Sequence, residues 1–185
     1  MSQDRIRKII IAGVMGAISA LLGWTHWGFI PWVTGAALTI MHVPVIIGAV
    51  LEGPIVGTAI GLIFGLFSML QAAVAPTGPS DVLFTNPLVA VIPRLFIGAV
   101  AWLAWRALKK WPAAGLVAAG IAGSLTNTIL VLGMIGLIGA APWAALPPIL
   151  LANGLPEAGV SAVITLIVVA AWRQIEVGRR KGSDL

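Results

Sequence analysis

Six long apolar segments dominate this sequence and leave little choice of fold. Hydrophobic residues make up 59% of the 185 residues, whereas charged residues make up only 9%. A helix needs about 20 apolar residues to cross the hydrocarbon core of a bilayer. The segments that reach or approach this length are residues 6–23, 37–52, 54–74, 86–108, 113–140 and 149–172. We therefore expect an all-α membrane protein, a bundle of six transmembrane helices that forms a single transmembrane domain over residues 1–185.

Basic residues lie at the ends of these segments, and their positions predict the orientation of the bundle. Most of the eleven Lys and Arg residues form three clusters, which six spans would bring to one side of the membrane. The clusters occupy residues 5–8, 106–110 and 173–181. Because loops rich in Lys and Arg stay inside the cell, we expect this side, with both termini, to be cytoplasmic. No basic stripe is formed, which argues against nucleic acid as a partner.

Arg94 is the only Lys or Arg set well inside an apolar segment. Before it, Asn86 can cap a helix, and Pro87 suits the first helical position, where no backbone donor is needed. Pro93 then falls inside the predicted helix, where it removes the donor to the Val89 carbonyl. An arginine in the middle of a membrane span costs roughly 2.5–3.5 kcal/mol on insertion scales. We therefore expect Arg94 to have a buried partner or a ligand.

Polar side chains on five different segments are predicted to lie at a similar depth. A rise of about 1.5 Å per residue, counted from the cytoplasmic end of each segment, places them in the outer half of a slab about 30 Å thick. These residues are His42, Gln71, Arg94, Asn127 and Glu157, with Asn86 and Asn153 near the outer mouth and Trp32 in the first outer loop. The sequence thus predicts a pocket in the outer half, suited to a small organic ligand.

The same residues also have structural explanations. Arg94 and Glu157 can neutralise one another, since their predicted heights differ by only about 6 Å. Asn127 can bond a neighbouring helix, and His42 can bridge two helices. The loop at residues 24–36, which is rich in Trp, either covers the pocket as a lid or forms an interfacial aromatic belt. Both interpretations stay open at this point.

Small residues at helical spacing predict packing faces. Segment 54–74 carries a glycine every fourth residue, which lets a neighbouring helix approach closely. These glycines are Gly53, Gly57, Gly61 and Gly65. The first segment has small residues over a wide arc, and we expect it to dock on another membrane subunit. Its small residues are Ala12, Gly16 and Ala20, with Gly13 and Ala17 alongside. Pro156 predicts that the last segment starts late or is broken there.

Motifs of enzyme and ATPase chemistry are absent from the sequence. It contains no GxxxxGK(S/T) phosphate loop, no HExxH or GxSxG motif and no cysteine. We therefore expect neither an enzyme nor a cofactor or metal site. Besides a ligand-binding subunit, one alternative is a self-contained, ion-coupled transporter that uses Arg94, Glu157 and His42 as a proton relay.

Two stretches resemble a known family. They are GAALTIMHVPVIIGAVLEGPIVGTAIGLIFGLFSML and PTGPSDVLFTNPLVAVIPRLFIG, and NGLPEAGVSAVITLIV is a further match. They are similar to the substrate-binding S component of energy-coupling factor (ECF) transporters. Within that family they most resemble the pantothenate subunits, through the P-T-x-P loop and the F-T-N-P-L-V-x-V-x-P-R segment.

The resemblance implies a six-helix subunit of the prokaryotic cytoplasmic membrane that binds a vitamin in its outer half. It also implies docking, through the first helix, on a scaffold membrane subunit that carries two ATPases. Arg94 would meet the pantothenate carboxylate, with hydrogen bonds from Asn86, Asn127, Asn153 and His42. Folate, cobalamin, pyridoxine and a thiamine precursor remain alternative ligands.

Overall fold

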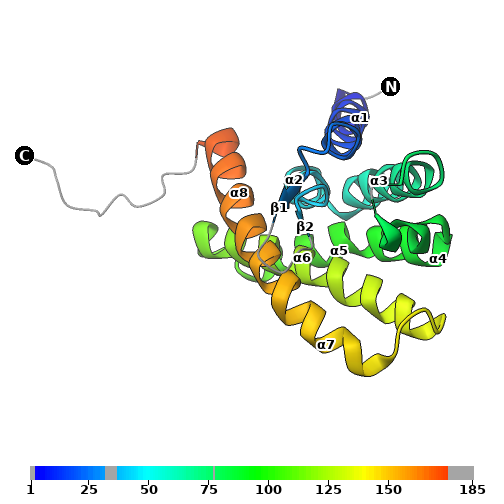
Figure 1. The fold of residues 1–185 in the computed structure, drawn as a ribbon. Coiled ribbons are helices and arrows are strands. Elements are labelled where there is room, and N and C mark those ends of the chain that lie inside the picture. The colour runs from blue at the N-terminus through cyan, green and yellow to red at the C-terminus, as the bar shows by residue number, and fades with distance from the viewer. Residues whose placement is uncertain (1–2, 32–36, 77, 175–185) are drawn as a thin grey trace, which may run out of the picture.

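The computed structural model describes residues 3–31, 37–76 and 78–174, and helices account for most of them. Figure 1 shows these helices packed side by side around the short helix α2, with the β1–β2 hairpin next to it. The helices are α1 (Gln3–Trp24), α2 (Val43–Glu52), α3 (Pro54–Val74), α4 (Pro87–Ala90), α5 (Ile92–Ala107), α6 (Pro112–Leu137), α7 (Leu146–Ile149) and α8 (Leu155–Arg173). Shorter helical turns occupy Pro79–Thr85, Trp143–Ala145 and Leu150–Gly154.

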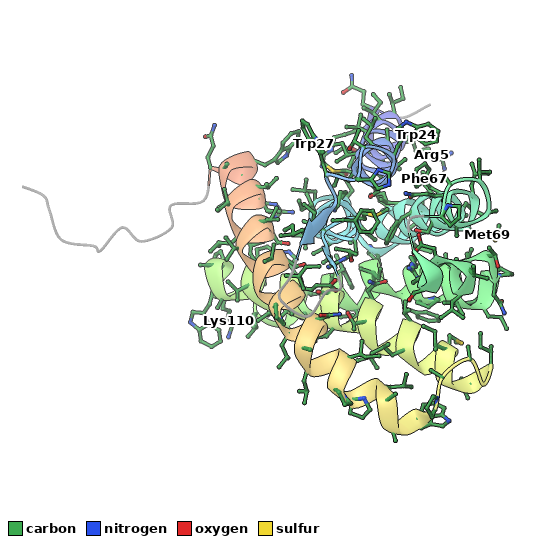
Figure 2. All side chains as sticks on the ribbon, viewed as in Figure 1. Arg5, Trp24, Trp27, Phe67, Met69 and Lys110 are labelled. Carbon is green, nitrogen blue, oxygen red and sulfur yellow. The ribbon has the colours of Figure 1, made fainter. Side chains whose placement is uncertain are left out.

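Five helices of the described chain are long and apolar enough to cross a membrane. They are Gln3–Trp24, Pro54–Val74, Pro87–Ala107, Pro112–Leu137 and Trp143–Arg173. Many large hydrophobic side chains on their outer faces are exposed, as lipid contact requires, and Figure 2 shows side chains projecting from the bundle on all sides. Five of the six expected spans are thus long helices, and the second, α2, is a shorter apolar helix.

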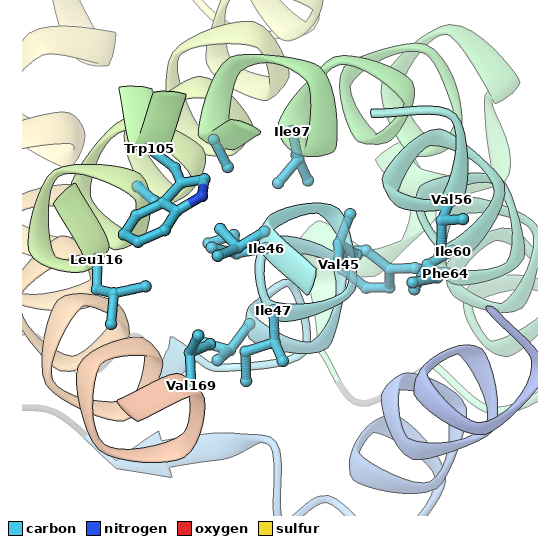
Figure 3. Packing of buried hydrophobic residues seen from close by; sticks show 14 of the residues in the cluster. Val45, Ile46, Ile47, Val56, Ile60, Phe64, Ile97, Trp105, Leu116 and Val169 are labelled. Atoms are coloured by element: carbon cyan, nitrogen blue, oxygen red, sulfur yellow. The ribbon is translucent and has the colours of Figure 1, made fainter. Parts of the chain in front are cut away.

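Helix α2 lies at the centre of the bundle. Its residues from Val43 to Val50 are all buried, which is the arrangement expected for a helix that is apolar on every side. In Figure 3 its side chains Val45, Ile46 and Ile47 lie among residues of four other helices. Those residues include Phe64, Ile97, Trp105, Leu116 and Val169. Ten residues of helix rise only about 15 Å, so α2 fills just part of the bundle's depth.

A β-hairpin precedes α2 in the chain, and its second strand lies where the sequence predicted helix from residue 37. Strand β1 (Phe29–Pro31) pairs antiparallel with β2 (Ala37–Thr39), and Phe29 lies opposite Thr39. Non-helical backbone at membrane depth is tolerated where it is buried in protein or lines a cavity, and Phe29 and Thr39 both line one. The predicted ligand residue Trp32 lies outside the described residues.

Prolines disturb two of the long helices locally, but neither helix is lost. The α4–α5 span breaks at Val91, two residues before Pro93. The last span begins at Trp143 instead of residue 149, and it passes through a π-helical turn at Leu150–Gly154. Pro156 cannot donate a backbone hydrogen bond to the residue four before it. The wider turn accommodates this loss without the predicted break.

Charged contacts join the ends of three helices at the side of the bundle with the basic clusters. Arg7 of α1 forms a salt bridge with Glu52 at the end of α2, with 2.7 Å between Nη2 and Oε1. Arg173 of α8 donates to the backbone carbonyl of Val50 at 2.8 Å. These contacts hold α1, α2 and α8 together at this end, which leaves the opposite end for the hairpin and the cavity.

Candidate functional site

A cavity of about 560 Å³ lies at the end of the bundle away from the basic clusters. This volume is within the range of about 300–1,000 Å³ that is usual for small-molecule sites. Its walls come from the hairpin, from the C-terminal halves of α3 and α6, and from the helical turn at Pro79–Thr85. The start of α5, helix α7, the turn at Leu150–Gly154 and the start of α8 complete them. The polar residues in its lining are Thr39, Ser68, Gln71, Ser80, Asp81, Arg94, Asn127, Thr128, Asn153 and Glu157.

Pro93 determines where the guanidinium of Arg94 lies. Because proline has no backbone N–H, the Val89 carbonyl loses the donor that a regular helix would supply. Arg94 takes that place, and its Nη1 donates a hydrogen bond to this carbonyl. The side chain therefore turns back along its own span toward the break between α4 and α5. A backbone carbonyl carries only a partial negative charge, so Arg94 keeps most of its positive charge uncompensated.

Two aromatic rings complete the surroundings of Arg94. Its guanidinium carbon lies 5.3 Å from the centre of the Phe64 ring and 5.0 Å from that of Phe84. Both distances suit cation–π contacts. Arg94 is only 4% exposed, and its Nε has no hydrogen-bond partner. A buried cation on the wall of a cavity, with an unused donor, is suited to bind an anionic group.

The glycines of α3 bring this helix close to the backbone of Arg94. A Cβ on Gly61 would overlap the carbonyl oxygen of Arg94, and one on Gly65 would lie 2.8 Å from the carbonyl oxygen of Ala90. The predicted packing face of the segment is thereby confirmed for the neighbouring α4–α5 span. Close approach of the two backbones places Phe64 of α3 next to Arg94.

Two carboxylates, those of Asp81 and Glu157, line the cavity together with Arg94. Glu157 is 7% exposed. Its Oε1 accepts a hydrogen bond from the backbone N–H of Thr39 at 2.6 Å. Its Oε2 lies 3.4 Å from the Thr128 hydroxyl, which divides its single proton between this oxygen and the Ser124 carbonyl at 3.3 Å. Arg94 bonds the Val89 carbonyl instead of this carboxylate. Within the described chain, Arg94 and Glu157 form no salt bridge. The interpretation that the two residues simply neutralise one another is therefore wrong for this structure.

Three predicted amide residues also line the cavity. Asn127 of α6 is 7% exposed, and its Oδ1 has no hydrogen-bond partner. Gln71 donates from Nε2 to the Gly23 carbonyl, which ties α3 to α1 beside the cavity. Asn153 lies in the π-helical turn. Five of the eight predicted ligand residues are thus brought to one chamber: Arg94, Glu157, Asn127, Gln71 and Asn153.

His42 and Asn86 are not in the lining of this cavity. His42 is fully buried at the start of α2, and its Nε2 lies 2.8 Å from the Ser161 hydroxyl of α8, so it bridges two helices. Asn86 caps α4 by accepting from the backbone N–H of Leu88 at 3.0 Å. In the described chain, Arg94, Glu157 and His42 each bond different groups and do not bond one another directly.

The predicted docking residues of α1 divide between two faces. Ala12 packs against the core, and a Cβ on Gly16 would lie 2.7 Å from the Ile63 side chain of α3. Ala20 is partly buried. Ala17 is exposed, and a Cβ on Gly13 would meet no atom within 4 Å. The outward face of α1 therefore consists of Gly13, Ala17 and exposed apolar neighbours.

Several lining residues were not predicted from the sequence. The aromatic pair Phe64 and Phe84 surrounds Arg94, and Thr39 and Thr128 bond Glu157. One signal was available for Phe64, because it follows Gly61 by three residues and so shares the glycine face of α3. The partners of Glu157 gave no such signal, because Thr39 lies 118 residues away in the sequence.

Comparison with known proteins adds a family and two relatives. The family model of the ECF transporter substrate-specific component matches residues 7–169. The chain is 28% identical to the pantothenic acid transporter PanT of Lactococcus lactis subsp. cremoris, over 92% of this chain and 96% of that protein. It is 33% identical to the pantothenate transporter PanT of Leuconostoc mesenteroides subsp. mesenteroides, over 60% of this chain and 55% of that protein.

Proposed function

Because the chain belongs to the family of ECF transporter substrate-specific components, we propose that it binds pantothenate in the cavity beside Arg94. Members of this family are transporter subunits in the prokaryotic cell membrane, so the chain is a multi-pass membrane protein and not an enzyme. S components pair with an ECF energising module. Pantothenate is the ligand named for both relatives, which favours it over folate, cobalamin, pyridoxine and a thiamine precursor.

The observation that supports this proposal most strongly is the buried, uncompensated charge of Arg94. Pantothenate carries a single carboxylate, and a guanidinium is the side-chain group whose donors best match a carboxylate. The unused Nε and the absence of a salt bridge to Glu157 leave Arg94 available for that carboxylate. Asn127, Asn153 and Gln71 supply amide groups in the same cavity for the rest of the ligand.

We further propose that the subunit docks on a scaffold membrane subunit driven by two ATPases. The exposed face of α1 around Gly13 and Ala17 is the surface we propose for this contact, since small residues allow helices in a membrane to approach closely. Ala12, Gly16 and Ala20 would then act mainly by holding α1 on the bundle.

Substitution of Arg94 tests the proposed function. We expect Arg94→Ala to weaken pantothenate binding by about a hundredfold, because a charge-assisted pair of hydrogen bonds is worth about 3 kcal/mol. Arg94→Lys keeps the charge without the planar fork, so its loss should be much smaller. Calorimetry on the purified protein measures both.

Arg106→Ala is the matched control. Arg106 also lies over an aromatic ring, that of Trp102 at 4.9 Å, but it is at the opposite end of the α5 span. This variant should bind pantothenate like the wild type. Equal binding by the wild type and both Arg94 variants would exclude the proposed role.

A further inference from the structure

We propose that Glu157 fixes the direction of the ligand in the cavity and excludes ligands with a second negative charge at the end away from Arg94. This inference rests on the proposed function, because it concerns the same cavity and the same ligand class. It goes further by assigning separate roles to Arg94 and Glu157 and by naming the chemical class that the site rejects.

Arg94 and Glu157 come from helices on either side of α6. Helix α6 packs against both α5, which carries Arg94, and α8, which carries Glu157. Asn127 and Thr128 of α6 line the cavity between them. The cavity therefore has Arg94 on one wall and Glu157 on another, with amide and hydroxyl groups of α6 between them. A second carboxylate, Asp81, lines the cavity from the helical turn at Pro79–Thr85.

The hydrogen bonds of Glu157 leave room for a ligand. An ionised carboxylate is purely an acceptor, with about four lone-pair sites. The Thr39 N–H and the Thr128 hydroxyl occupy one oxygen each, and no basic side chain of the described chain pairs with Glu157. The remaining lone pairs can accept hydrogen bonds from ligand hydroxyl groups. The same carboxylate would repel a ligand group with a negative charge.

Pantothenate fits this arrangement in one direction. It is anionic at its carboxylate end, has an amide in the middle, and carries two hydroxyl groups at the other end. With the carboxylate on Arg94, the amide lies toward α6, where Asn127 Oδ1 has no partner, and the hydroxyl groups reach Glu157. In the reverse direction, the ligand carboxylate would face Glu157, and Arg94 would lose its anionic partner.

Exclusion of phosphorylated ligands follows from this orientation. A phosphate monoester on the terminal hydroxyl group would add about 1.5 to 2 negative charges at neutral pH. That group would lie against the buried carboxylate of Glu157. The subunit should therefore bind free pantothenate and reject its 4′-phosphate ester.

Calorimetry with pantothenate and its 4′-phosphate ester tests this inference on the purified protein. We expect the wild type to prefer pantothenate by at least about a hundredfold, and Glu157→Gln to reduce this preference at least tenfold, mainly through tighter binding of the ester. Glu52→Gln makes the same change at a carboxylate near the opposite end of the bundle. It should keep the wild-type preference.

A wild-type measurement covers the case in which Glu157→Gln does not fold. An analogue of pantothenate without the two hydroxyl groups should bind at least tenfold more weakly, because it leaves the buried acceptors of Glu157 unpaired. Equal binding of the ester and pantothenate, equal binding of the analogue, or an unchanged preference in Glu157→Gln would each overturn the role of Glu157. Those results leave pantothenate binding itself intact. Failure of the wild type to bind pantothenate at all would overturn the proposed function and this inference together.

Discussion

The guanidinium of Arg94 is held by groups that stabilise a cation without neutralising it. The Val89 carbonyl accepts a hydrogen bond from Nη1, and the rings of Phe64 and Phe84 make cation–π contacts with the guanidinium. Each of these contacts is weaker than a buried ion pair with a carboxylate would be. The charge is therefore positioned firmly, and its attraction for an anion is largely preserved.

Pro93 is essential to this positioning, and its replacement makes a prediction. In Pro93→Ala the new backbone N–H can bond the Val89 carbonyl, so it competes with Arg94 for that acceptor. Loss of one hydrogen bond of about 0.5–1.5 kcal/mol should weaken pantothenate binding about two- to tenfold. Thermal stability should change little, since Pro93 is the second residue of α5, where a helix tolerates either proline or alanine. Calorimetry and thermal unfolding measure the two effects.

Pro87→Ala is the control for this prediction. Pro87 begins α4, where the helix needs no backbone donor, and it is exposed. Its replacement should leave pantothenate binding unchanged. If Pro93→Ala binds pantothenate as tightly as the wild type does, the Val89 carbonyl has no part in positioning Arg94.

At the scale of residues, the sequence was enough to predict that Pro93 frees the Val89 carbonyl, but not where the Arg94 side chain lies. Proline chemistry alone predicted that the Val89 carbonyl would lose its donor. The conformation of the Arg94 side chain depends on Phe64 and Phe84, which belong to other elements, so no local pattern contains it. The same holds for His42, whose contact with Ser161 crosses 119 residues of sequence.

Close packing of α3 on the α4–α5 span is the main feature at the scale of elements. Gly57 lies against Gly98, Gly61 against the Arg94 carbonyl and Gly65 against Ala90. The Thr58 hydroxyl adds a hydrogen bond to the Leu95 carbonyl at 3.2 Å. This contact supports the cavity, because it fixes the distance between Phe64 and Arg94.

Substitution of Gly61 should therefore destabilise the protein. In Gly61→Ala the methyl group would overlap the Arg94 carbonyl, so the two helices must separate. Such overpacking typically costs about 1–3 kcal/mol, which would lower the midpoint of thermal unfolding by about 2–12 °C. A fluorescence or calorimetric melt in detergent measures this change.

Gly133→Ala provides the comparison within α6. A Cβ at Gly133 meets no atom within 4 Å, and alanine favours the helix over glycine. Its melting midpoint should stay the same or rise. Equal midpoints for Gly61→Ala and the wild type would mean that α3 and α5 are less closely packed than described.

The elements were predictable where periodicity and length decide the structure, and less so where tertiary packing does. Long apolar runs predicted the five long helices to within a few residues at most ends. Residues 37–39 were predicted as helix because they are apolar too, but pairing with residues 29–31 makes them a strand. The π-helical turn before Pro156 was likewise missed, because proline alone does not say whether a helix breaks or widens.

The whole molecule is asymmetric along the direction of its helices. Basic side chains and their contacts with α2 occupy one end, and the cavity with its polar walls occupies the other. Counting residues along each span was enough to predict this polar layer, since rise per residue is fixed in a helix. The residue count does not say which side chains face the cavity. For this reason we expected His42 and Asn86 in the cavity lining, and the structure places them outside it.

A structure of the protein with pantothenate bound is the most direct test of the claim that this cavity binds the vitamin through Arg94. We predict that a carboxylate oxygen of pantothenate lies about 3 Å from a guanidinium nitrogen of Arg94. Its hydroxyl groups should lie toward Glu157. Pantothenate bound outside the cavity, or with its hydroxyl groups at Arg94 and its carboxylate elsewhere, would contradict this account.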